Sequence, residues 1–553
     1  MKKKTILVCC LSLLVHGVFA QFRVNGRKVV FDASANTYMV SIPDENFGTD
    51  YQADIAVVQD SLWTDVTIDG TETGSGFVFR SVEPGKQYSI GGKRNGRAFN
   101  SYITFTSLPM VDLKGEFGYD YANGTIEIMV PSATETELSL IKAKWRGNST
   151  NAPNKHKRNY KIKTLNEKGK AKDVSFLGMR EDNNWILDAG QADMFRVRNR
   201  IATELWQDMG AKPYYSDKEP KAQNAVNGQV VELILNNSYA GVYSFTEAMD
   251  RKQLKLKKYD SKEGAFHGML WKANDYVNSG FWNTGRDYDD NSGTWKSFEV
   301  KYPDIDDVCP TDYSKLYEAV DFVVSADDDT FREHVAEYFD LPLLIDYYVF
   351  INTISAVDNT AKNICWAIYD QAVDRKLTVA VWDLDMSVGG KWQKGTTPPA
   401  YVAPDYMLPI GANNIFYRLV KLNVDGFNEK VAMRYWQLRR NLFSEQSLKE
   451  RYNAYYRRLA NSGAAKREEN RWSKDSDING KELDFEREIE YISQWITTRL
   501  QCLDSGMFRL PTGIDEVNNE DMRTERIYNV QGQRLGQIPA RGVYIVNGRK
   551  YAR

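Results

Sequence analysis

The period of the apolar residues changes along this 553-residue chain, and that change constrains the fold more than any other feature. From Gln21 to about Leu108, short runs such as Tyr102–Phe105 alternate apolar and polar residues between turn residues. Alternation with period two is typical of half-buried strands. The last third instead carries apolar residues at helical spacing, of which the clearest stripe is Ile489, Ile492, Ile496, Leu500 and Leu503. The chain is therefore predicted to be an α+β protein of several domains.

Composition excludes some classes of function. The 72 Lys and Arg residues are balanced by 74 Asp and Glu residues, so the basic excess typical of nucleic-acid-binding proteins is missing, and no nucleic-acid partner is expected. Three cysteines follow the first twenty residues. Three is a small and uneven number, so the chain cannot be built on a scaffold of disulfide bonds. An H-E-x-x-H zinc site is excluded because the only histidines are His16, His156, His267 and His334.

The first twenty residues have the order of a secretory signal peptide. Lys2–Lys4 precede an apolar run from Ile6 to Val15, and Val18–Ala20 ends in the small residue expected before a cleavage point. The apolar run is shorter than the ~20 residues that a bilayer requires, and so is Leu341–Ile354. We therefore expect a secreted or outer-surface protein without a transmembrane helix.

Composition shifts divide the remaining chain into three parts. Strands are expected at Thr125–Val130 and Glu137–Lys144, and a helix between Asp193 and Gly210. Two strands joined by a Gly/Pro-rich turn are expected near the C-terminus. The predicted organisation is a signal peptide at 1–20, a small antiparallel, Ig-like β-sandwich at 21–110, an α+β domain at 111–508 and a short β tail at 513–553.

Residues suited to catalysis surround a predicted hairpin. The apolar helical segment Leu343–Ile354 leads into a polar loop that contains Asp358 and Asn363. Two apolar strands, at 364–369 and 377–382, then run out and back on either side of a polar turn. The loop and the end of the returning strand should therefore lie at the same end of the hairpin.

The register of this hairpin predicts which polar residues meet. A turn centred between Val373 and Asp374 places Ile364 opposite Asp383, because opposite residues in a strand pair lie ~5 Å apart. Asp385 would share a face with Asp383 if both belong to the strand. The preceding loop would then approach Asp383 directly.

This arrangement suits phosphoryl transfer. Carboxylate and amide oxygens are the ligands that Mg²⁺ prefers, and a further carboxylate can accept the proton of the attacking hydroxyl. Asp358 and Asn363 have the D-x4-N spacing of a kinase catalytic loop, and Asp383 follows a strand as a second metal-binding Asp would. Asp385 is then either a ligand or a supporting residue. In the alternative interpretation there is no metal site: Asp358-Asn359 is only the turn that ends a helix, and Asp385 is a solvent-exposed strand end.

A second segment is suited to binding phosphate. Arg146, Asn148 and Ser149 flank a glycine at a predicted strand end, where backbone N–H groups can point at an anion. A basic strand follows, in which alternation directs one set of lysines across the sheet toward a nucleotide. Glu247, near the end of an apolar strand, would hold such a lysine by an ion pair or would be an exposed acidic residue.

At these residues the chain resembles the CotH family of atypical, secreted or spore-coat protein kinases. The resemblance covers about Lys142 to Gly390. The matching signatures, in order, are Arg146-Gly-Asn-Ser-Thr150, Lys157–Lys163, Leu177-Gly178, Trp185-Ile-Leu187, Arg198-Asn199, Gly241-x-Tyr243-x3-Glu247, Asp358-Asn359 with Asn363, and Trp382-Asp383-Leu384-Asp385-x3-Gly389.

The resemblance implies a diverged protein-kinase-like fold, the cofactors ATP and Mg²⁺ or Mn²⁺, and transfer to hydroxyls of a protein substrate. It implies that Asp358 is the catalytic carboxylate. Asn363 and Asp383 would be metal ligands, with Asp385 as the alternate. Lys161 or Lys157 would meet the phosphates. The tail, with its Gly542-Val-Tyr-Ile-Val546 strand, resembles the sorting segments of type IX secretion cargo.

Three functions follow from these patterns. The first is an exported kinase. The second is a catalytically inactive kinase-like surface protein that binds a surface glycan or an envelope component through its 13 Trp and 32 Tyr residues. The third is a glycosidase, which would require two carboxyl groups such as Asp383 and Asp358 to face a sugar cleft with ~5–9 Å between them.

Overall fold

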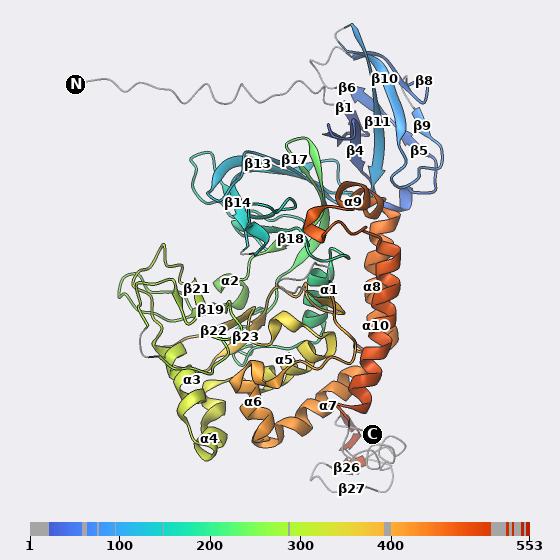
Figure 1. The fold of residues 1–553 in the computed structure, drawn as a ribbon. Helices are drawn as coiled ribbons and strands as arrows, with labels where there is room; N and C mark the ends of the chain where they lie inside the picture. The colour runs from blue at the N-terminus through green and yellow to red at the C-terminus, as the bar shows by residue number, and fades with distance from the viewer. Residues whose placement is uncertain are drawn as a thin grey trace, which may run out of the picture.

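The computed structural model describes residues 22–57, 63–73, 77–94, 96–147, 149–285, 288–391 and 400–509, together with four short strands between 527 and 552. The predicted signal peptide lies outside the described residues. Three parts follow one another in Figure 1: an N-terminal β module, a β-barrel beneath it, and a second lobe of mixed sheet and helices. Residues from distant parts of the chain can therefore meet between the barrel and the second lobe.

The N-terminal module consists of short strands around one apolar core that includes Phe22, Val40, Ile90 and Phe105. Its largest sheet has the order β3-β4-β11-β10-β7-β8, beside a β2-β1-β6 sheet and a β5-β9 pair. The strands are β1 (Phe22–Val24), β2 (Arg27–Lys28), β3 (Val30–Asp32), β4 (Thr37–Ser41), β5 (Tyr51–Ala53), β6 (Ile55–Val57), β7 (Trp63–Ile68), β8 (Thr71–Glu72), β9 (Phe77–Phe79), β10 (Tyr88–Arg94) and β11 (Arg97–Thr106), with a 3-10 turn η1 at Asp44–Asn46.

The prediction of a purely antiparallel sandwich is wrong at one strand pair. β4 and β11 are parallel, with Tyr38 opposite Ile103. More than fifty residues separate these strands, and a connection of that length permits the crossover that parallel pairing requires. The module is tied to the barrel by Arg27, whose guanidinium donates to the carbonyl oxygens of Pro131 at 2.6 Å and Ala133 at 2.8 Å.

The second part is a closed seven-stranded barrel in the order β12-β13-β14-β15-β16-β18-β17. Its strands are β12 (Met110–Lys114), β13 (Ala122–Met129), β14 (Thr136–Arg146), β15 (Asn159–Leu165), β16 (Asn184–Asp188), β17 (Gly228–Leu235) and β18 (Ser238–Glu247). Alternate residues such as Val111, Ile126, Ile141 and Ile162 fill its interior. The strand predictions for this region are confirmed. Closure was not predicted, because it depends on the parallel pairing of β12 with the distant strand β17.

The second lobe contains a five-stranded sheet in the order β20-β21-β19-β22-β23. Helices α1, α3, α5, α6 and α7 contribute to one continuous core with this sheet, which includes Trp206, Trp271, Tyr347 and Trp366. The sheet comprises β19 (Met269–Ala273), β20 (Thr294–Trp295), β21 (Phe298–Tyr302), β22 (Ile364–Ile368) and β23 (Thr378–Val381). The helices are α1 (Arg198–Asp208), α2 (Arg251–Leu254), α3 (Ser314–Ser325), α4 (Asp328–Tyr338), α5 (Leu341–Ile354), α6 (Asn414–Lys421) and α7 (Phe427–Arg439).

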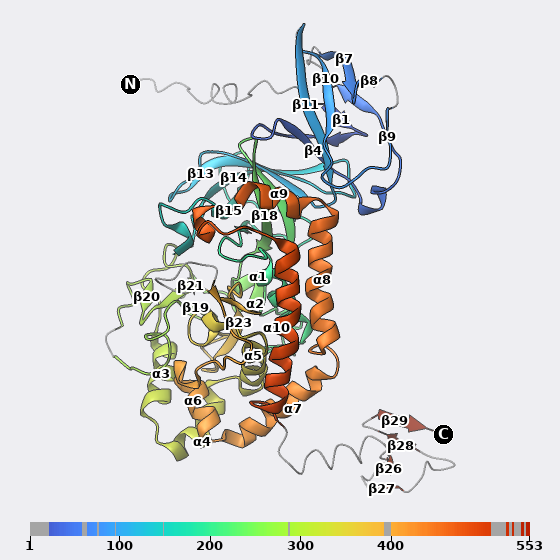
Figure 2. The same ribbon diagram turned by 45° about the vertical axis from the view of Figure 1, so that its right-hand side comes forward.

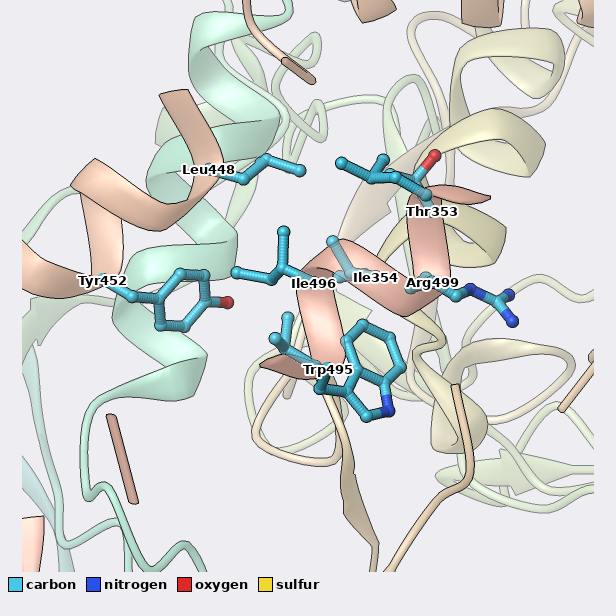
Figure 3. Close-up of a pocket in the computed structure, with 9 residues that line it drawn as sticks. Thr353, Ile354, Leu448, Tyr452, Trp495, Ile496 and Arg499 are labelled. Carbon is cyan, nitrogen blue, oxygen red and sulfur yellow. The ribbon is translucent and has the colours of Figure 1, made fainter. Parts of the chain in front are cut away.

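Helices α8 (Glu445–Asn461) and α10 (Phe485–Ser505) lie side by side along the domain, and α9 (Ala464–Trp472) joins their ends next to the barrel (Figures 1 and 2). The predicted stripe of apolar residues on α10 is buried from Ile489 to Leu503, so that prediction is confirmed. A small apolar pocket lies between α5, α8 and α10, lined by residues such as Ile354, Leu448 and Ile496 (Figure 3). None of the predicted site residues lines it.

Shorter elements complete the described part of the chain. They are η2 (Ser149–Asn151), η3 (Val357–Asn359), η4 (Ile410–Ala412), η5 (Val424–Gly426), η6 (Ser476–Ile478), β24 (Gly390–Lys391), β25 (Ala400–Tyr401) and the tail strands β26 (Ile527–Asn529), β27 (Arg534–Leu535), β28 (Val543–Val546) and β29 (Arg549–Ala552). The tail therefore has four short strands where two were expected. Among the described residues, no helix combines the length and the apolar character needed to cross a bilayer.

Candidate active site between the barrel and the second lobe

The predicted hairpin forms, but with a different register. Ile364 lies opposite Val381, so paired positions sum to 745 and the turn is centred one residue earlier than expected. The shift arises because Asp370 closes the turn early, accepting backbone N–H groups from Val373 at 3.2 Å and Asp374 at 3.0 Å on its carbonyl oxygen. The strand β23 consequently ends before Asp383.

Asp383 and Asp385 therefore belong to a loop, and the expectation that they share a strand face is wrong. The backbone at Asp383 is left-handed, with φ of 58°, so the chain turns away from the strand direction at that residue. The N–H of the following residue, Leu384, donates to Oδ1 of Asn199 at 3.0 Å. This bond fixes the loop to the start of α1.

Two loops are nevertheless brought together by direct hydrogen bonds. The N–H of Val357 donates to the carbonyl of Met386 at 3.2 Å, and the N–H of Val388 donates to the carbonyl of Ile354 at 2.7 Å. Nδ2 of Asn359 donates to the carbonyl of Trp382 at 2.8 Å. Because these bonds flank Asp358 on one side and Asp383 and Asp385 on the other, the loops carrying the three aspartates lie side by side.

Asp358 is held by a lysine and a tyrosine. It lies in η3, just after the left-handed residue Ser355 ends α5. Nζ of Lys362 contacts its Oδ2 at 2.9 Å, and the hydroxyl of Tyr276 donates to its Oδ1. Burial lowers the pKa of Lys362, but Asp358 and, more weakly, Asp383 outweigh that effect and raise it overall. Lys362 therefore remains charged beside the carboxylate.

Asp385 lies in a strongly acidic environment. Burial raises its pKa well above the ordinary value for an aspartate, and the charges of Asp383, Asp188 and Asp358 raise it further. Burial and the charge of Asp383 likewise raise the pKa of Asp188. Carboxylates gathered in this way repel one another, and a bound cation would relieve that repulsion.

Asp188 was not among the predicted site residues. It is the last residue of the buried strand β16, and its Oδ2 accepts a hydrogen bond from Nδ2 of Asn199 at 2.7 Å. Asn199 thus connects the barrel to the loop after Asp383. The sequence contained a usable signal, because an aspartate that follows the apolar run Trp185–Leu187 has the same strand-end position that singled out Asp383.

Two buried amide oxygens near these aspartates have no hydrogen-bond donor among the described residues. They are Oδ1 of Asn363 and Oδ1 of Asn359. Asn363 is 1 % exposed and has a left-handed backbone, with φ of 58°, and its N–H donates to the carbonyl of Ala273 at 2.8 Å. A buried carbonyl oxygen without a donor costs free energy, and coordination of a cation would satisfy it.

Arg146 brings the barrel into contact with this group. It is the last residue of β14, and its guanidinium lies over the ring of Trp382 at 5.3 Å. Its charge acts on Asp188, where it opposes the rise in pKa. Asn148 lies outside the described residues, and Ser149 begins η2. Gly147 has φ of 105°, and a Cβ at this position would lie 2.0 Å from Oγ1 of Thr150.

The structure distinguishes the two candidate lysines. Lys157 is 1 % exposed, and its ammonium contacts the carbonyl oxygens of Ala189 at 2.8 Å and Val242 at 2.6 Å and Oε1 of Glu468 at 2.9 Å. These three acceptors use all three of its N–H donors. The ammonium group of Lys161, in contrast, makes no hydrogen bond or ion pair with any described residue. Burial lowers its pKa to about 8, with a further contribution from Lys163.

Lys161 belongs to a cluster of lysines on the outer face of β14 and β15. Lys144 is directly opposite Lys161, and Lys142 is directly opposite Lys163. The ammonium groups of three of them lie over the ring of Tyr121, at 5.2 Å for Lys142, 4.9 Å for Lys144 and 5.5 Å for Lys163. Like charges placed opposite each other destabilise a sheet, so this face is suited to an anion.

The contacts of Glu247 are with residues other than these lysines. It is fully buried at the end of β18 and accepts hydrogen bonds from the N–H of Arg180 at 3.2 Å and from the N–H and Nδ2 of Asn227 at 3.1 and 3.0 Å. Among the described residues, its charged partner is the guanidinium of Arg180, with Nε at 3.8 Å. The structure thus places Glu247 in contact with loop residues of the barrel.

The helix predicted to begin at Asp193 begins five residues later, at Arg198, because Arg196 has a left-handed backbone with φ of 63°. Asp193 still contacts the helix start, since its Oδ2 accepts the N–H of Arg198 at 2.8 Å. Arg198 also pairs with the buried carboxylates of Asp193 and Glu488, each at 2.5 Å. This network holds the neighbouring Asn199 in place.

Comparison with known families decides the classification. The family model described as CotH kinase protein matches residues 143–503, which is more than half of the chain. The chain belongs to the CotH kinase family. The matched region contains Arg146, Asp188, Asp358, Asp383 and Asp385, so the interface between barrel and second lobe lies within the family domain. No curated protein matches the chain.

Proposed function

We propose that this CotH-family protein is an exported protein kinase that transfers phosphate from ATP to hydroxyl groups of a protein, with Mg²⁺ or Mn²⁺. The observation that carries the proposal is the hydrogen bonding of the two loops that brings Asp358 next to Asp383 and Asp385. A proton acceptor and a set of metal ligands are the two groups that phosphoryl transfer requires, and they come from these loops.

The residues at this site fit a divalent cation. Asp383, Asp385 and Asp188 supply hard oxygen atoms, and the buried Oδ1 of Asn363 lacks a donor among the described residues. We assign Asp383 and Asn363 as ligands, with Asp385 and Asp188 completing the acidic set. When bound, the ion would neutralise charge that develops on the transferred phosphoryl group.

Asp358 would accept the proton of the attacking hydroxyl at its Oδ1. Lys362 contacts the other carboxylate oxygen at 2.9 Å and so orients the group. Arg146, stacked on Trp382, and the unpaired Lys161 supply positive charge on the barrel side, where the phosphates of ATP would lie. Lys157 has its donors occupied by the protein, so we assign the phosphate contact to Lys161.

The test is transfer of labelled phosphate from ATP to a casein-like acceptor in the presence of Mn²⁺. Asp358→Asn keeps the shape of the side chain but weakens its basicity, so we expect it to abolish transfer while the melting temperature stays near that of the wild type. Asp329→Asn is the matched control, because the side chain of Asp329 is 97 % exposed on α4. It should retain full activity.

The alternatives give different results in the same measurement. Binding of nucleotide with no transfer under any metal would favour the catalytically inactive interaction protein. A melting temperature that does not respond to nucleotide and metal would favour a glycan-binding role. Hydrolysis of a glycoside that Asp383→Asn abolishes would favour the glycosidase.

Export is part of the proposal and rests on the sequence. The charged and apolar order of residues 1–20 supports a signal peptide, and the resemblance of the tail to type IX sorting segments supports delivery to the cell surface or beyond it. Fractionation of cells that express the full chain tests this part. We expect the mature protein to begin after Ala20, as determined by N-terminal sequencing.

A further inference from the structure

Tyr276 occupies an unusual position beside the proposed proton acceptor. It lies three residues beyond β19, in a turn where Oδ1 of Asp275 accepts the N–H groups of Val277 at 2.8 Å and Asn278 at 2.7 Å. The residue is 40 % exposed, and its hydroxyl donates a hydrogen bond to Oδ1 of Asp358. A hydroxyl that comes from an exposed turn therefore reaches the carboxylate.

Both oxygen atoms of that carboxylate are occupied. Lys362 holds Oδ2 at 2.9 Å, and its ammonium also lies 5.6 Å from the centre of the Tyr276 ring. The other oxygen atom, Oδ1, accepts a hydrogen bond from the hydroxyl of Tyr276, and it is the atom that would accept the proton of an attacking hydroxyl. Tyr276 thus presents its hydroxyl where the hydroxyl of a protein substrate would have to bind.

The electrostatics of this hydroxyl are consistent with that position. Burial raises the pKa of Tyr276, and the neighbouring charge of Asp358 raises it further, so the hydroxyl keeps its proton at neutral pH. The charge of Asp385 also contributes, so the hydroxyl is near a residue that we assign to the metal site. A general base is most useful for such a hydroxyl, which is not ionised by itself.

We propose that Tyr276 is a phosphoryl acceptor of the protein itself, an inference that rests on the proposed kinase function. The phenolic oxygen attacks the γ-phosphorus of ATP, and a new O–P bond forms. The bond from that phosphorus to the bridging oxygen breaks, its electron pair leaves with ADP, and the phenolic proton goes to Asp358. The products are ADP and phosphotyrosine.

The modification would change the site. Phosphotyrosine carries close to two negative charges at neutral pH and has lost the hydroxyl hydrogen that Asp358 accepts. Repulsion between the phosphate and the carboxylate would move Tyr276 away and free Oδ1 of Asp358 for the hydroxyl of another protein. Modification of Tyr276 would therefore precede efficient transfer to an added acceptor.

The experiment is a time course of the purified full chain with ATP and Mn²⁺, followed by phosphopeptide mapping by mass spectrometry. We expect phosphate on Tyr276 at a first-order rate that does not change across a dilution series, and no phosphate in Asp358→Asn. In Tyr276→Phe the modification should be absent, while transfer to casein continues without an initial lag. Tyr102→Phe is the matched control, because Tyr102 is also 40 % exposed, and it should behave as the wild type.

The outcomes separate the inference from the function on which it rests. Transfer of phosphate to casein by a protein whose Tyr276 stays unmodified would overturn the inference and leave the kinase function intact. A rate of Tyr276 modification that falls in proportion to dilution would also overturn it, because transfer would then occur between molecules. Absence of transfer to both Tyr276 and casein would overturn the kinase function and the inference together.

Discussion

Replacing each of two nearby lysines by methionine tests which one binds nucleotide. Lys157 and Lys161 are separated by three residues, and the same substitution removes the same charge from each. We expect Lys157→Met to lose stability and keep its response to nucleotide. We expect Lys161→Met to keep its stability and lose that response. Lys168→Met, at an exposed position in the following turn, is the control.

The loss of stability at Lys157 can be worked out from its contacts. Removing the ammonium takes the donor from the carbonyl oxygens of Ala189 and Val242, and each buried polar group left in that state costs about 1–3 kcal/mol. Loss of the ion pair with Glu468 costs less free energy, because this carboxylate keeps its contacts with Nε of Arg196 at 2.7 Å and with the N–H of Val242 at 2.7 Å. Burial lowers the pKa of Lys157 to about 8, so the variant also avoids some cost of desolvation.

The net expected loss is about 2–3 kcal/mol in the free energy of unfolding. An unfolding entropy of about 2.1 cal/mol/K per residue, over the family domain that extends from 143 to 503, converts this into about 3–4 °C in Tm. At Lys161 we expect an unchanged or slightly higher Tm, because Lys163, Lys301 and Lys144 surround it with like charge.

Calorimetry with and without an ATP analogue and Mn²⁺ measures both quantities. The assignment of Lys161 to the phosphates is refuted if Lys161→Met keeps the full nucleotide-dependent rise in Tm. It is equally refuted if Lys157→Met is as stable as the wild type but no longer responds to nucleotide.

Three further predictions follow from the site and its supports. Because burial and neighbouring lysines lower the pKa of Lys161 to about 8, the affinity for ATP measured by fluorescence titration should fall by about tenfold per pH unit above that value, and Lys161→Met should lack this dependence. Gly241→Ala should lower the free energy of unfolding by about 2 kcal/mol or more, measured as a lower urea midpoint, because its Cβ would lie 2.2 Å from Oε2 of Glu468 at φ of 109°; an unchanged midpoint would contradict this packing. Arg146→Ala should raise KM for ATP with a loss of only about 0.5–1 kcal/mol in stability, since its contact with Trp382 is a single cation–π pair, and an effect on kcat alone would argue against a phosphate contact.

The sequence pattern was sufficient to predict those elements whose structure depends on residues close together in the chain. The strands β13, β14 and β15, the helix α5 and the buried stripe of α10 were predicted because alternation or helical spacing directly reflects burial of one face. The proximity of Asp358 and Asp383 was also predicted, because a hairpin returns the chain to its starting end. The register was wrong because Asp370 closes the turn by contacts that the apolar pattern does not contain.

Positions determined by distant partners were not predictable in this way. Lys157 and Lys161 are four residues apart, so both would lie on one face of a continuous strand. The strand begins only at Asn159, however, so alternation does not determine where Lys157 points. Its direction is decided by Glu468 of α9, which lies far away in the sequence. The same holds for Asp188, which reaches the second lobe through Asn199.

The sequence by itself determined the kinds of elements, the polar loop with Asp358 and its approach to Asp383, because each depends on residues that are close to one another along the chain. Only the tertiary structure decided that the barrel closes, that Asp188 joins the acidic group and that Tyr276 reaches Asp358. The physical reason is that burial and charge in these places come from segments that meet only after folding. Alternation along a strand predicts which residues share a face. The segment that packs against that face determines the burial and the charge that those residues experience, and therefore their role.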